Sequence, residues 1–294
     1  MTEIKIMVFR HSAFYSPLIA AIAGGFLKKE GLTASYTVLP AGASIMDEFA
    51  EGRVDVAQAA VSVSWSELEK ARKPAVAQFA QINTRDGFFI AAREPDSDFS
   101  WSKLKTGQFM HVHGGQPEVM LRYGASQMGV DLDQVERINV PGIDAMMDAW
   151  RRGEGDFFHE QGAYPQQLAH ENCAHIVAAV GDAVGPVAFS SLVCRWDWLP
   201  TDEARRFTAA YRSARKFVDG AEPVVIAETV AEYFSDHSLQ AVSRAIETYQ
   251  KSGTWNGDIA IPHELYDNAL NVFEHAGLIT RRHPYEEVVA PPPA

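Results

Sequence analysis

From the start of the chain, short apolar runs typical of strands alternate with longer stretches of helical periodicity. The apolar runs have the length and the flanking turn residues of strands, and the periodic stretches have the spacing of amphipathic helices. Alternation of this kind predicts a βαβαβ unit, and with it a mostly parallel sheet. The expected strands are 4–9, 33–39 and 54–57, and the expected helices are 16–30 and 44–51.

Part of this unit recurs at a fixed distance of 101 residues. In each copy a proline leaves a strand, a helix carries a Met and an aromatic residue, a glycine ends it and an aspartate opens the next strand. This recurrence predicts two lobes built on one plan. The alternative is that two generic α/β units simply use the same turns. The pairs join Pro40, Met46, Asp47, Phe49, Gly52 and Asp55 to Pro141, Met147, Asp148, Trp150, Gly153 and Asp156.

Two apolar runs flank the second unit and are the expected crossings between the lobes, at 88–92 and 187–193. The second lobe is then an insertion. The predicted division is a discontinuous first lobe, 1–91 and 190–294, and an inserted second lobe, 92–189. Four helical patterns after Pro200 are expected to cover the first lobe: 201–219, 223–234, 239–252 and 262–276.

The amino-acid composition limits the kinds of partner and of stabilising site that the protein can have. The 38 acidic and 26 basic residues give a net charge of −12, which opposes binding of nucleic acid. The two cysteines, Cys173 and Cys194, exclude a disulfide framework and are too few for a structural zinc site. No apolar run is long enough for membrane insertion. The start has no leader pattern, so we expect a cytoplasmic protein as written, or a periplasmic one if a leader has been removed.

Candidate binding residues lie in the loops that leave the strands and in the crossings, because open parallel sheets bind ligands beyond the carboxyl ends of their strands. Hydroxyls, amides and backbone N–H groups there suit an anionic or strongly hydrogen-bonding ligand, and aromatic rings suit a flat one. The predicted ligand-binding residues are His11, Phe14, Tyr15, Ser44, Gln58, Ser62, Trp65, Asn83, His113, Gly114, Gly115, Gln116, His159, Glu160, Tyr164 and Ser190.

Histidines in these loops leave a metal site open as an alternative. His111 and His113 alternate along an extended segment, and His159 precedes Glu160. Direct hydrogen bonding of a ligand is the favoured interpretation, and structural histidines are the third. We expect no resident metal or cofactor. Catalysis has no motif here: nucleophile elbow, Walker loop, zinc-protease helix and dinucleotide fingerprint are all missing.

Three segments resemble a known superfamily. They are Phe14-Tyr15-Ser16-Pro17, the segment 25–32 and Gly52-Arg53-Val54-Asp55-Val56. Over residues 1–220 the chain resembles the alkanesulfonate, nitrate and taurine binding proteins together with the yeast-type thiamine-pyrimidine synthase. The resemblance implies an α/β, two-lobed, periplasmic-binding-protein-like fold of type II, the venus flytrap, with a hinge of two crossing segments.

The synthase branch of this superfamily depends on a lysine that holds pyridoxal phosphate, on a histidine and on a cysteine cluster. Counted from the shared glycine, the lysine position falls at Ala59 and the histidine position at Val63. The cluster maps onto 190–194, where only Cys194 is a cysteine. Alanine forms no Schiff base and valine has no imidazole, so this chemistry is disfavoured.

The predicted function is binding of a small metabolite, anionic or nitrogenous and aromatic, in the cleft between the lobes. The protein would serve an ABC-type uptake system, with a transporter permease as partner, or act as an intracellular carrier. The alternative is a cytosolic enzyme on the same fold that uses the loop histidines and Glu160, with or without a metal. A regulatory domain is the third possibility, and no apolar or basic stretch supports it.

Overall fold

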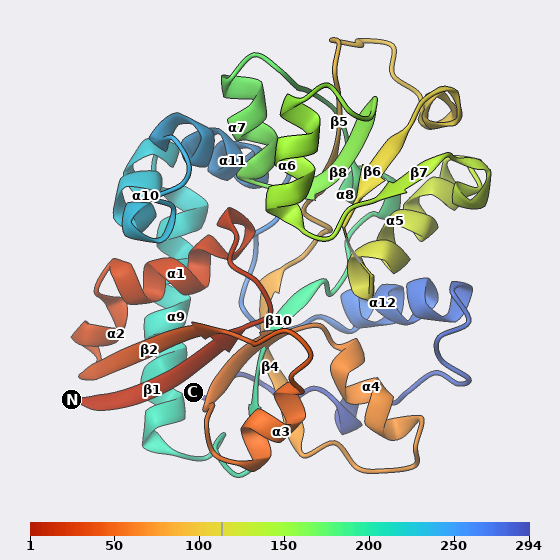
Figure 1. Cartoon of the computed structure of the whole chain (residues 1–294). Coiled ribbons are helices and arrows are strands. Elements are labelled where there is room, and N and C mark those ends of the chain that lie inside the picture. The colour runs from red at the N-terminus through yellow and green to blue at the C-terminus, as the bar shows by residue number, and fades with distance from the viewer. Residues whose placement is uncertain (113) are drawn as a thin grey trace.

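Two five-stranded sheets organise the chain, in a computed structural model that describes residues 1–112 and 114–294 (Figure 1). The first has the order β2-β1-β3-β10-β4 and the second the order β7-β6-β8-β5-β9. The first sheet consists of β1 (Thr2–Val8), β2 (Leu32–Val38), β3 (Val56–Ala59), β4 (Val76–Asn83) and β10 (Ser190–Arg195). The second consists of β5 (Phe88–Ala92), β6 (Phe109–His111), β7 (Arg137–Asn139), β8 (Phe157–Gln161) and β9 (His175–Ala179).

Both sheets are mostly parallel, as the sequence pattern predicts, and each contains one reversed strand. In the first, β1 runs parallel to β2 and β3, but β10 runs antiparallel to β3 and β4. In the second, β6 runs parallel to β7 and β8, but β5 runs antiparallel to β8 and β9. The reversed strands are those that follow a crossing, since a chain arriving from the other lobe needs no crossover helix to pair antiparallel. The two-lobed α/β fold itself is confirmed.

The crossings are shorter than the apolar runs suggest. All of 88–92 is β5 of the second sheet, and 190–193 is already β10 of the first. The chain therefore crosses at 84–87 and 185–189, which lie side by side in the middle of Figure 1. The predicted first boundary, after residue 91, falls inside β5, because an apolar run describes burial and does not separate a crossing from a strand.

The repeated aspartates have the same structural role in both lobes. The Lys5 N–H donates to Asp55 Oδ2 at 2.8 Å, and the Asp55 N–H donates to the Lys5 carbonyl at 2.9 Å. The Gln108 N–H donates to Asp156 Oδ2 at 2.8 Å, and the Asp156 N–H donates to the Gln108 carbonyl at 2.8 Å. Each aspartate thus joins the start of its strand to the first strand of its own unit, as a common plan requires.

The helices before these aspartates also correspond. Phe49 of α3 (Ile45–Ala50) and Trp150 of α6 (Ile143–Arg151) are both fully buried. Gly52 and Gly153 follow them with φ of +67° and +94°, a left-handed conformation that only glycine adopts readily. The helix expected over 16–30 is in fact two, α1 (Ser16–Ala23) and α2 (Phe26–Lys29), because Gly25 takes φ +71° between them.

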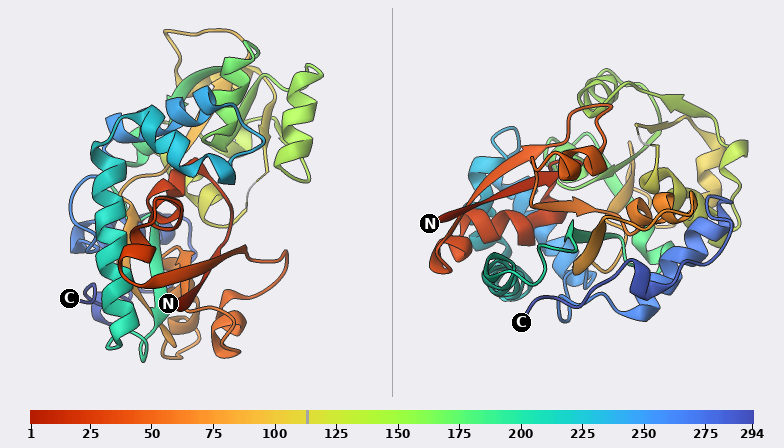
Figure 2. Two further views of the ribbon diagram at one scale, coloured as in Figure 1. Left: turned by 90° about the vertical axis from the view of Figure 1, so that its left-hand side faces the viewer. Right: turned by 90° about the horizontal axis from the view of Figure 1, so that it is seen from below.

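The C-terminal helices cover the first lobe, as the sequence predicts, and they also contact the second. α9 (Asp202–Gly220) packs on α1 and α2, but α11 (Leu239–Lys251) also contacts α7 (Tyr164–His170), and α12 (His263–His275) contacts α5 (Gln116–Gln127) (Figure 2). Helices facing two partners carry the same amphipathic pattern as helices facing one. The chain end then docks along the first sheet, where the Ala290 N–H donates to the Gln78 carbonyl at 2.9 Å.

The remaining elements connect these layers. They are α4 (Ser62–Leu68), α8 (Val180–Val184), α10 (Pro223–Val230) and the short 3₁₀ helices η1 (Ala13–Tyr15), η2 (Trp101–Thr106), η3 (Leu132–Gln134), η4 (Ala231–Tyr233) and η5 (Tyr285–Glu287). Across the part of the chain described here, we find no helix with the length and apolar character that crossing a membrane requires.

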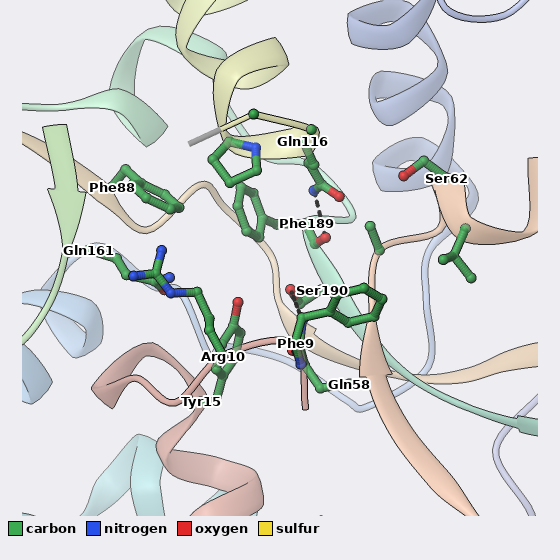
Figure 3. A pocket seen from close by; sticks show the side chains of 15 residues that line it. Phe9, Arg10, Tyr15, Gln58, Ser62, Phe88, Gln116, Gln161, Phe189 and Ser190 are labelled. Atoms are coloured by element: carbon green, nitrogen blue, oxygen red, sulfur yellow. Dashed lines mark hydrogen bonds between the residues drawn. The ribbon is translucent and has the colours of Figure 1, made fainter. Parts of the chain in front are cut away.

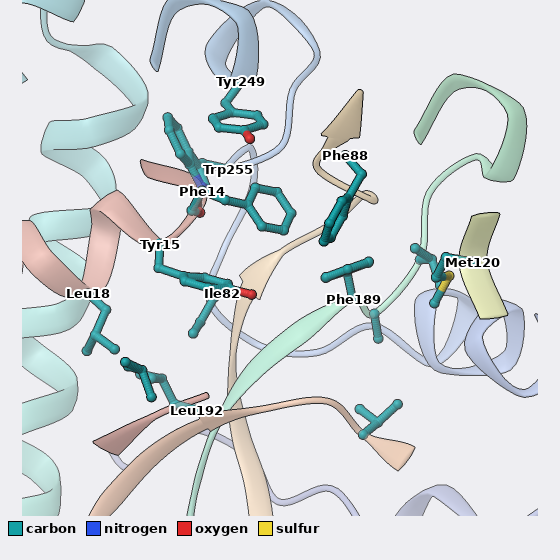
Figure 4. Packing of buried hydrophobic residues seen from close by; sticks show 14 of the residues in the cluster. Phe14, Tyr15, Leu18, Ile82, Phe88, Met120, Phe189, Leu192, Tyr249 and Trp255 are labelled. Atoms are coloured by element: carbon teal, nitrogen blue, oxygen red, sulfur yellow. Dashed lines mark hydrogen bonds between the residues drawn. The ribbon is translucent and has the colours of Figure 1, made fainter. Parts of the chain in front are cut away.

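An aromatic cluster packs around the crossings (Figure 4). The Phe14 ring lies 5.0 Å from that of Tyr249 and 5.3 Å from that of Phe189. Tyr249 Oη donates to the Gly87 carbonyl at 2.9 Å and accepts from the Gly162 N–H at 2.8 Å. A Cβ on Gly87 would lie 2.3 Å from the Phe14 ring, so only glycine allows this approach. The hinge is therefore a packed region in which the two lobes share one core.

Candidate ligand-binding cleft

A cavity of about 280 Å³ lies between the two sheets, beside the crossings (Figure 3). Its lining comes from the ends of β1, β3 and β8, the starts of α4, α5, β5 and β10, and η1. Both lobes therefore contribute, as expected of a site at the carboxyl ends of strands. The lining residues are Phe9, Arg10, Tyr15, Gln58, Ala60, Ser62, Val63, Phe88, Gly114, Gly115, Gln116, Pro117, Gln161, Phe189 and Ser190.

Aromatic side chains form much of the wall. Phe9 and Tyr15 come from the first lobe, Phe88 begins the second sheet, and Phe189 ends the second crossing. Figure 3 shows these rings around one space rather than stacked on one another. The Phe88 ring is fixed from behind, because His159 stacks on it with ring centroids 4.5 Å apart. Rings held in this way offer a flat ligand a large contact area at little entropic cost.

Amide and hydroxyl groups hold the floor of the cavity together. Gln58 Nε2 donates to Ser190 Oγ at 3.1 Å, and Gln58 Oε1 accepts from the Phe9 N–H at 3.1 Å. On the opposite side, Gln116 Nε2 donates to the Phe189 carbonyl at 2.7 Å. These bonds fix the side chains in place, and their remaining donors and acceptors can bind a ligand in the cavity.

An ion pair joins the two lobes at one wall. Arg10 Nη2 lies 2.9 Å from Glu160 Oε1, with side-chain exposures of 18% and 0%. The Gln161 amide, in the orientation that satisfies its neighbours, accepts from Arg10 Nε at 2.9 Å and donates to Ser12 Oγ at 3.1 Å. Ser12 Oγ donates in turn to the Gly162 carbonyl at 2.7 Å. The end of β1 is thus bonded to the end of β8 through several groups.

Burial keeps the Tyr15 hydroxyl protonated. Loss of solvent raises the pKa of this phenol, and the nearby Arg10 charge only partly offsets the effect. The hydroxyl points into the cavity in Figure 3. It can therefore act as a neutral donor or acceptor toward a ligand.

The structure brings several of the predicted site residues to this cavity. They are Tyr15, Gln58, Ser62, Gly114, Gly115, Gln116 and Ser190. His113 lies outside the described residues. Contact with a ligand stays a prediction for all of them.

Other predicted site residues lie outside the lining because they pack in the core or, for Ser44, cap a helix. The Phe14 ring belongs to the aromatic cluster, and Asn83 Nδ2 donates to the Phe14 carbonyl at 2.7 Å. Trp65 is buried, and its Nε1 donates to Tyr266 Oη at 2.8 Å, so it ties α4 to α12. Ser44 caps α3 by accepting from the Asp47 N–H at 3.4 Å.

The histidine loops are likewise separate from the cavity lining. His11 Nδ1 lies 3.0 Å from Tyr36 Oη, and the Tyr164 ring packs against His237, both around a smaller hollow of about 60 Å³. His159 and Glu160 stand one layer behind the wall, against Phe88 and Arg10.

The metal alternative rested on His111, His113, His159 and Glu160. His111 Nδ1 lies 3.5 Å from Glu118 Oε2, on the α5 side of the second sheet. Within residues 1–112 and 114–294, no group of three or more His, Cys, Asp or Glu side chains converges to hold an ion. His113 falls outside that range.

The sequence prediction missed eight of these lining residues, and four of the eight fall into two kinds. Arg10 stands two residues after β1 and Gln161 ends β8, so their position marked them, but their pairing depends on how the lobes meet. Phe88 and Phe189 flank the crossings, where an apolar run is equally well explained by a buried strand. The others are Phe9, Ala60, Val63 and Pro117.

Known proteins resemble the chain in sequence and in fold. The model of the NMT1-like family matches residues 2–233. A protein of Bacillus subtilis (strain 168), YtlA, whose name calls it a binding protein, is 25% identical over 297 residues, covering 98% of this chain and 88% of that one.

Two solved structures share the fold at low identity. One is the alkanesulfonate-binding protein SsuA of Xanthomonas axonopodis pv. citri bound to MOPS, with a TM-score of 0.73, 12% identity and 99% of both chains covered. The other is the ligand-binding component of an ABC-type import system from Staphylococcus aureus with zinc bound, with a TM-score of 0.73, 13% identity and 99% and 97% covered. These likenesses confirm the expected two-lobed, periplasmic-binding-protein-like fold.

Proposed function

The chain belongs to the NMT1-like family, and on that premise we propose that it binds a small, flat, uncharged molecule in the cavity between its two sheets. The observation that carries this proposal is the set of aromatic rings that both lobes direct toward one space of about 280 Å³. Small-molecule sites are concave, mostly apolar and supplied with a few polar groups that fix orientation. The cavity between Phe9, Tyr15, Phe88 and Phe189 has these properties.

The electrostatics of the lining favour a ligand without net charge. Arg10 is the one ionised side chain among the described lining residues, and the Glu160 carboxylate lies 2.9 Å from it. A sulfonate or nitrate entering this site would bring a negative charge that the Arg10–Glu160 pair does not balance. The amides of Gln58 and Gln116 and the Tyr15 hydroxyl suit ring nitrogens and amino groups instead. Of the two ligand classes expected from the sequence, these features support the nitrogenous aromatic one.

We propose that binding is coupled to closure of the two lobes, because the cavity lies between them. Its walls come from both lobes, so a ligand gains its full set of contacts only when the lobes are together. A relative in fold is named as the ligand-binding component of an ABC-type import system. We propose the same role for this chain, with an importer permease as its partner.

A panel of small molecules tests the ligand class. We expect at least one of benzamide, nicotinamide and adenine to raise the melting temperature of the protein in proportion to the logarithm of its concentration, since a ligand that binds only the folded state adds stability by mass action. Ethanesulfonate and nitrate, at equal ionic strength, are expected to leave it unchanged. A rise with ethanesulfonate or nitrate, and none with the three flat molecules, would contradict the proposal.

A further inference from the structure

One ion pair stands where a ligand would meet the wall of the cavity. Arg10 follows β1 of the first sheet and lines the cavity, whereas Glu160, in β8 of the second, is completely buried behind it. The guanidinium is in contact with the cavity and the carboxylate is not. A bound molecule would therefore contact the guanidinium of Arg10 directly, whereas Arg10 would separate it from the carboxylate of Glu160.

The surroundings of the pair hold both groups in place. Gln161 Oε1 accepts from Arg10 Nε at 2.9 Å and from Nη1 at 3.0 Å. The Gln161 N–H donates to Glu160 Oε1 at 2.8 Å. Arg10 Cζ lies 5.7 Å from the centroid of the Phe88 ring, so an aromatic wall residue flanks the cation. These contacts hold the guanidinium at the wall of the cavity.

We propose that the Arg10–Glu160 pair selects the charge of the ligand, by presenting a cation whose field the carboxylate behind it cancels. The inference rests on the proposed function of the cavity. In a site with little water, an uncompensated charge is costly, so binding favours whichever ligand leaves the site neutral. Discrimination then comes from the penalty on charged competitors as much as from contacts with the favoured ligand.

Removing one partner should reverse this preference in a predictable direction. Glu160→Gln leaves the Arg10 charge without its carboxylate and keeps an oxygen that can accept from the Gln161 N–H. The variant should favour an anion. Arg10→Met removes the cation and keeps an apolar stem, so the Glu160 charge behind the wall should favour a cation. The double variant is neutral again and should return to the preference of the wild type.

Benzamide, benzoate and benzamidine measure this preference, since they share one ring and nearly one shape while their charges are 0, −1 and +1. Dissociation constants would be determined by calorimetric titration at pH 7 for the wild type, Glu160→Gln, Arg10→Met and the double variant. Arg151→Met and Glu171→Gln provide the matched control, because that pair has the same 2.9 Å separation but lies on the surface.

We expect the wild type to prefer benzamide over both ions by about tenfold or more. Glu160→Gln should shift the benzoate-to-benzamide ratio by about tenfold toward benzoate, and Arg10→Met the benzamidine ratio by a similar factor. Unchanged ratios in both single variants, with benzamide still bound, would overturn the role of the pair while leaving the proposed function intact. No binding of any probe by any of the proteins would contradict the proposed function and, with it, this inference. If Arg10→Met fails to fold, Glu160→Gln decides alone.

Discussion

Replacement of Asp86 by asparagine is expected to raise the free energy of unfolding by about 5 kcal/mol at pH 9 and to change it little at pH 4. Asp86 lies in the first crossing and is buried. Burial raises the pKa of its carboxyl to about 8, and the hydrogen bond from the Phe88 N–H offsets only part of this. The residue therefore opposes folding whenever the unfolded chain has lost the proton that the folded chain retains.

The sign follows from where the proton resides. Below the pKa of the unfolded carboxyl, near 3.9, both states are protonated and the burial has no electrostatic cost. As the pH rises toward 8, stability falls by about 1.4 kcal/mol for each pH unit, and above 8 the loss is constant. Asparagine has no such titration. It keeps the oxygen that accepts from the Phe88 N–H at 2.7 Å.

Urea unfolding followed by tryptophan fluorescence measures this difference at pH 4, 6.5 and 9. Asp98→Asn is the matched control, because Asp98 is exposed. We expect a gain that grows with pH for Asp86→Asn and none for the control. An equal difference at all three pH values would mean that Asp86 does not titrate in this range, and that its burial is not the cause of the gain.

Ala60→Trp should weaken ligand binding on the order of 100-fold without unfolding the protein. Ala60 follows β3 and lines the cavity with its small side chain. An indole at this position would occupy the space that a flat ligand needs, while the Ala60 carbonyl could still accept from Gln78 Nε2 at 3.1 Å. Because the indole would extend into the cavity and not into the packed core, the substitution should remove no core contact.

Melting temperatures in the presence and absence of the best compound of the panel test the Ala60→Trp prediction. Ala209→Trp, on the exposed side of α9, adds the same indole outside the cavity and should bind as the wild type does. Retention of the full ligand-induced rise by Ala60→Trp would show that the compound binds elsewhere.

Much of the fold was predictable because its strongest constraints are local or repeated. Asp55 and Asp156 recur at one spacing since each makes the same two hydrogen bonds to a neighbouring residue's backbone, one through its carboxylate and one through its N–H. Features that depend on direction in space were not predictable. Hydrophobic periodicity does not reveal that β10 pairs antiparallel with its neighbours, or that α11 contacts both lobes.

The same distinction between local and spatial features applies to the residues of the candidate site. Gln58 and Ser190 were predictable because each stands at the end or start of a strand, where ligands bind in such sheets. Trp65 has the right residue type and loop, yet it points into the core toward Tyr266. Residue type cannot distinguish a pocket wall from core packing. The Arg10–Glu160 pair joins residues 150 positions apart, so only the meeting of the lobes reveals it.

Hydrogen exchange with and without the panel compound that stabilises the protein most is the direct test of binding between the lobes. We expect added protection in segments of both lobes that line the cavity, 9–16 and 58–63 on one side and 114–118 on the other. The Ala60→Trp variant should show none of it. Protection confined to one lobe, or to segments away from the cavity, would contradict a ligand site between the two sheets.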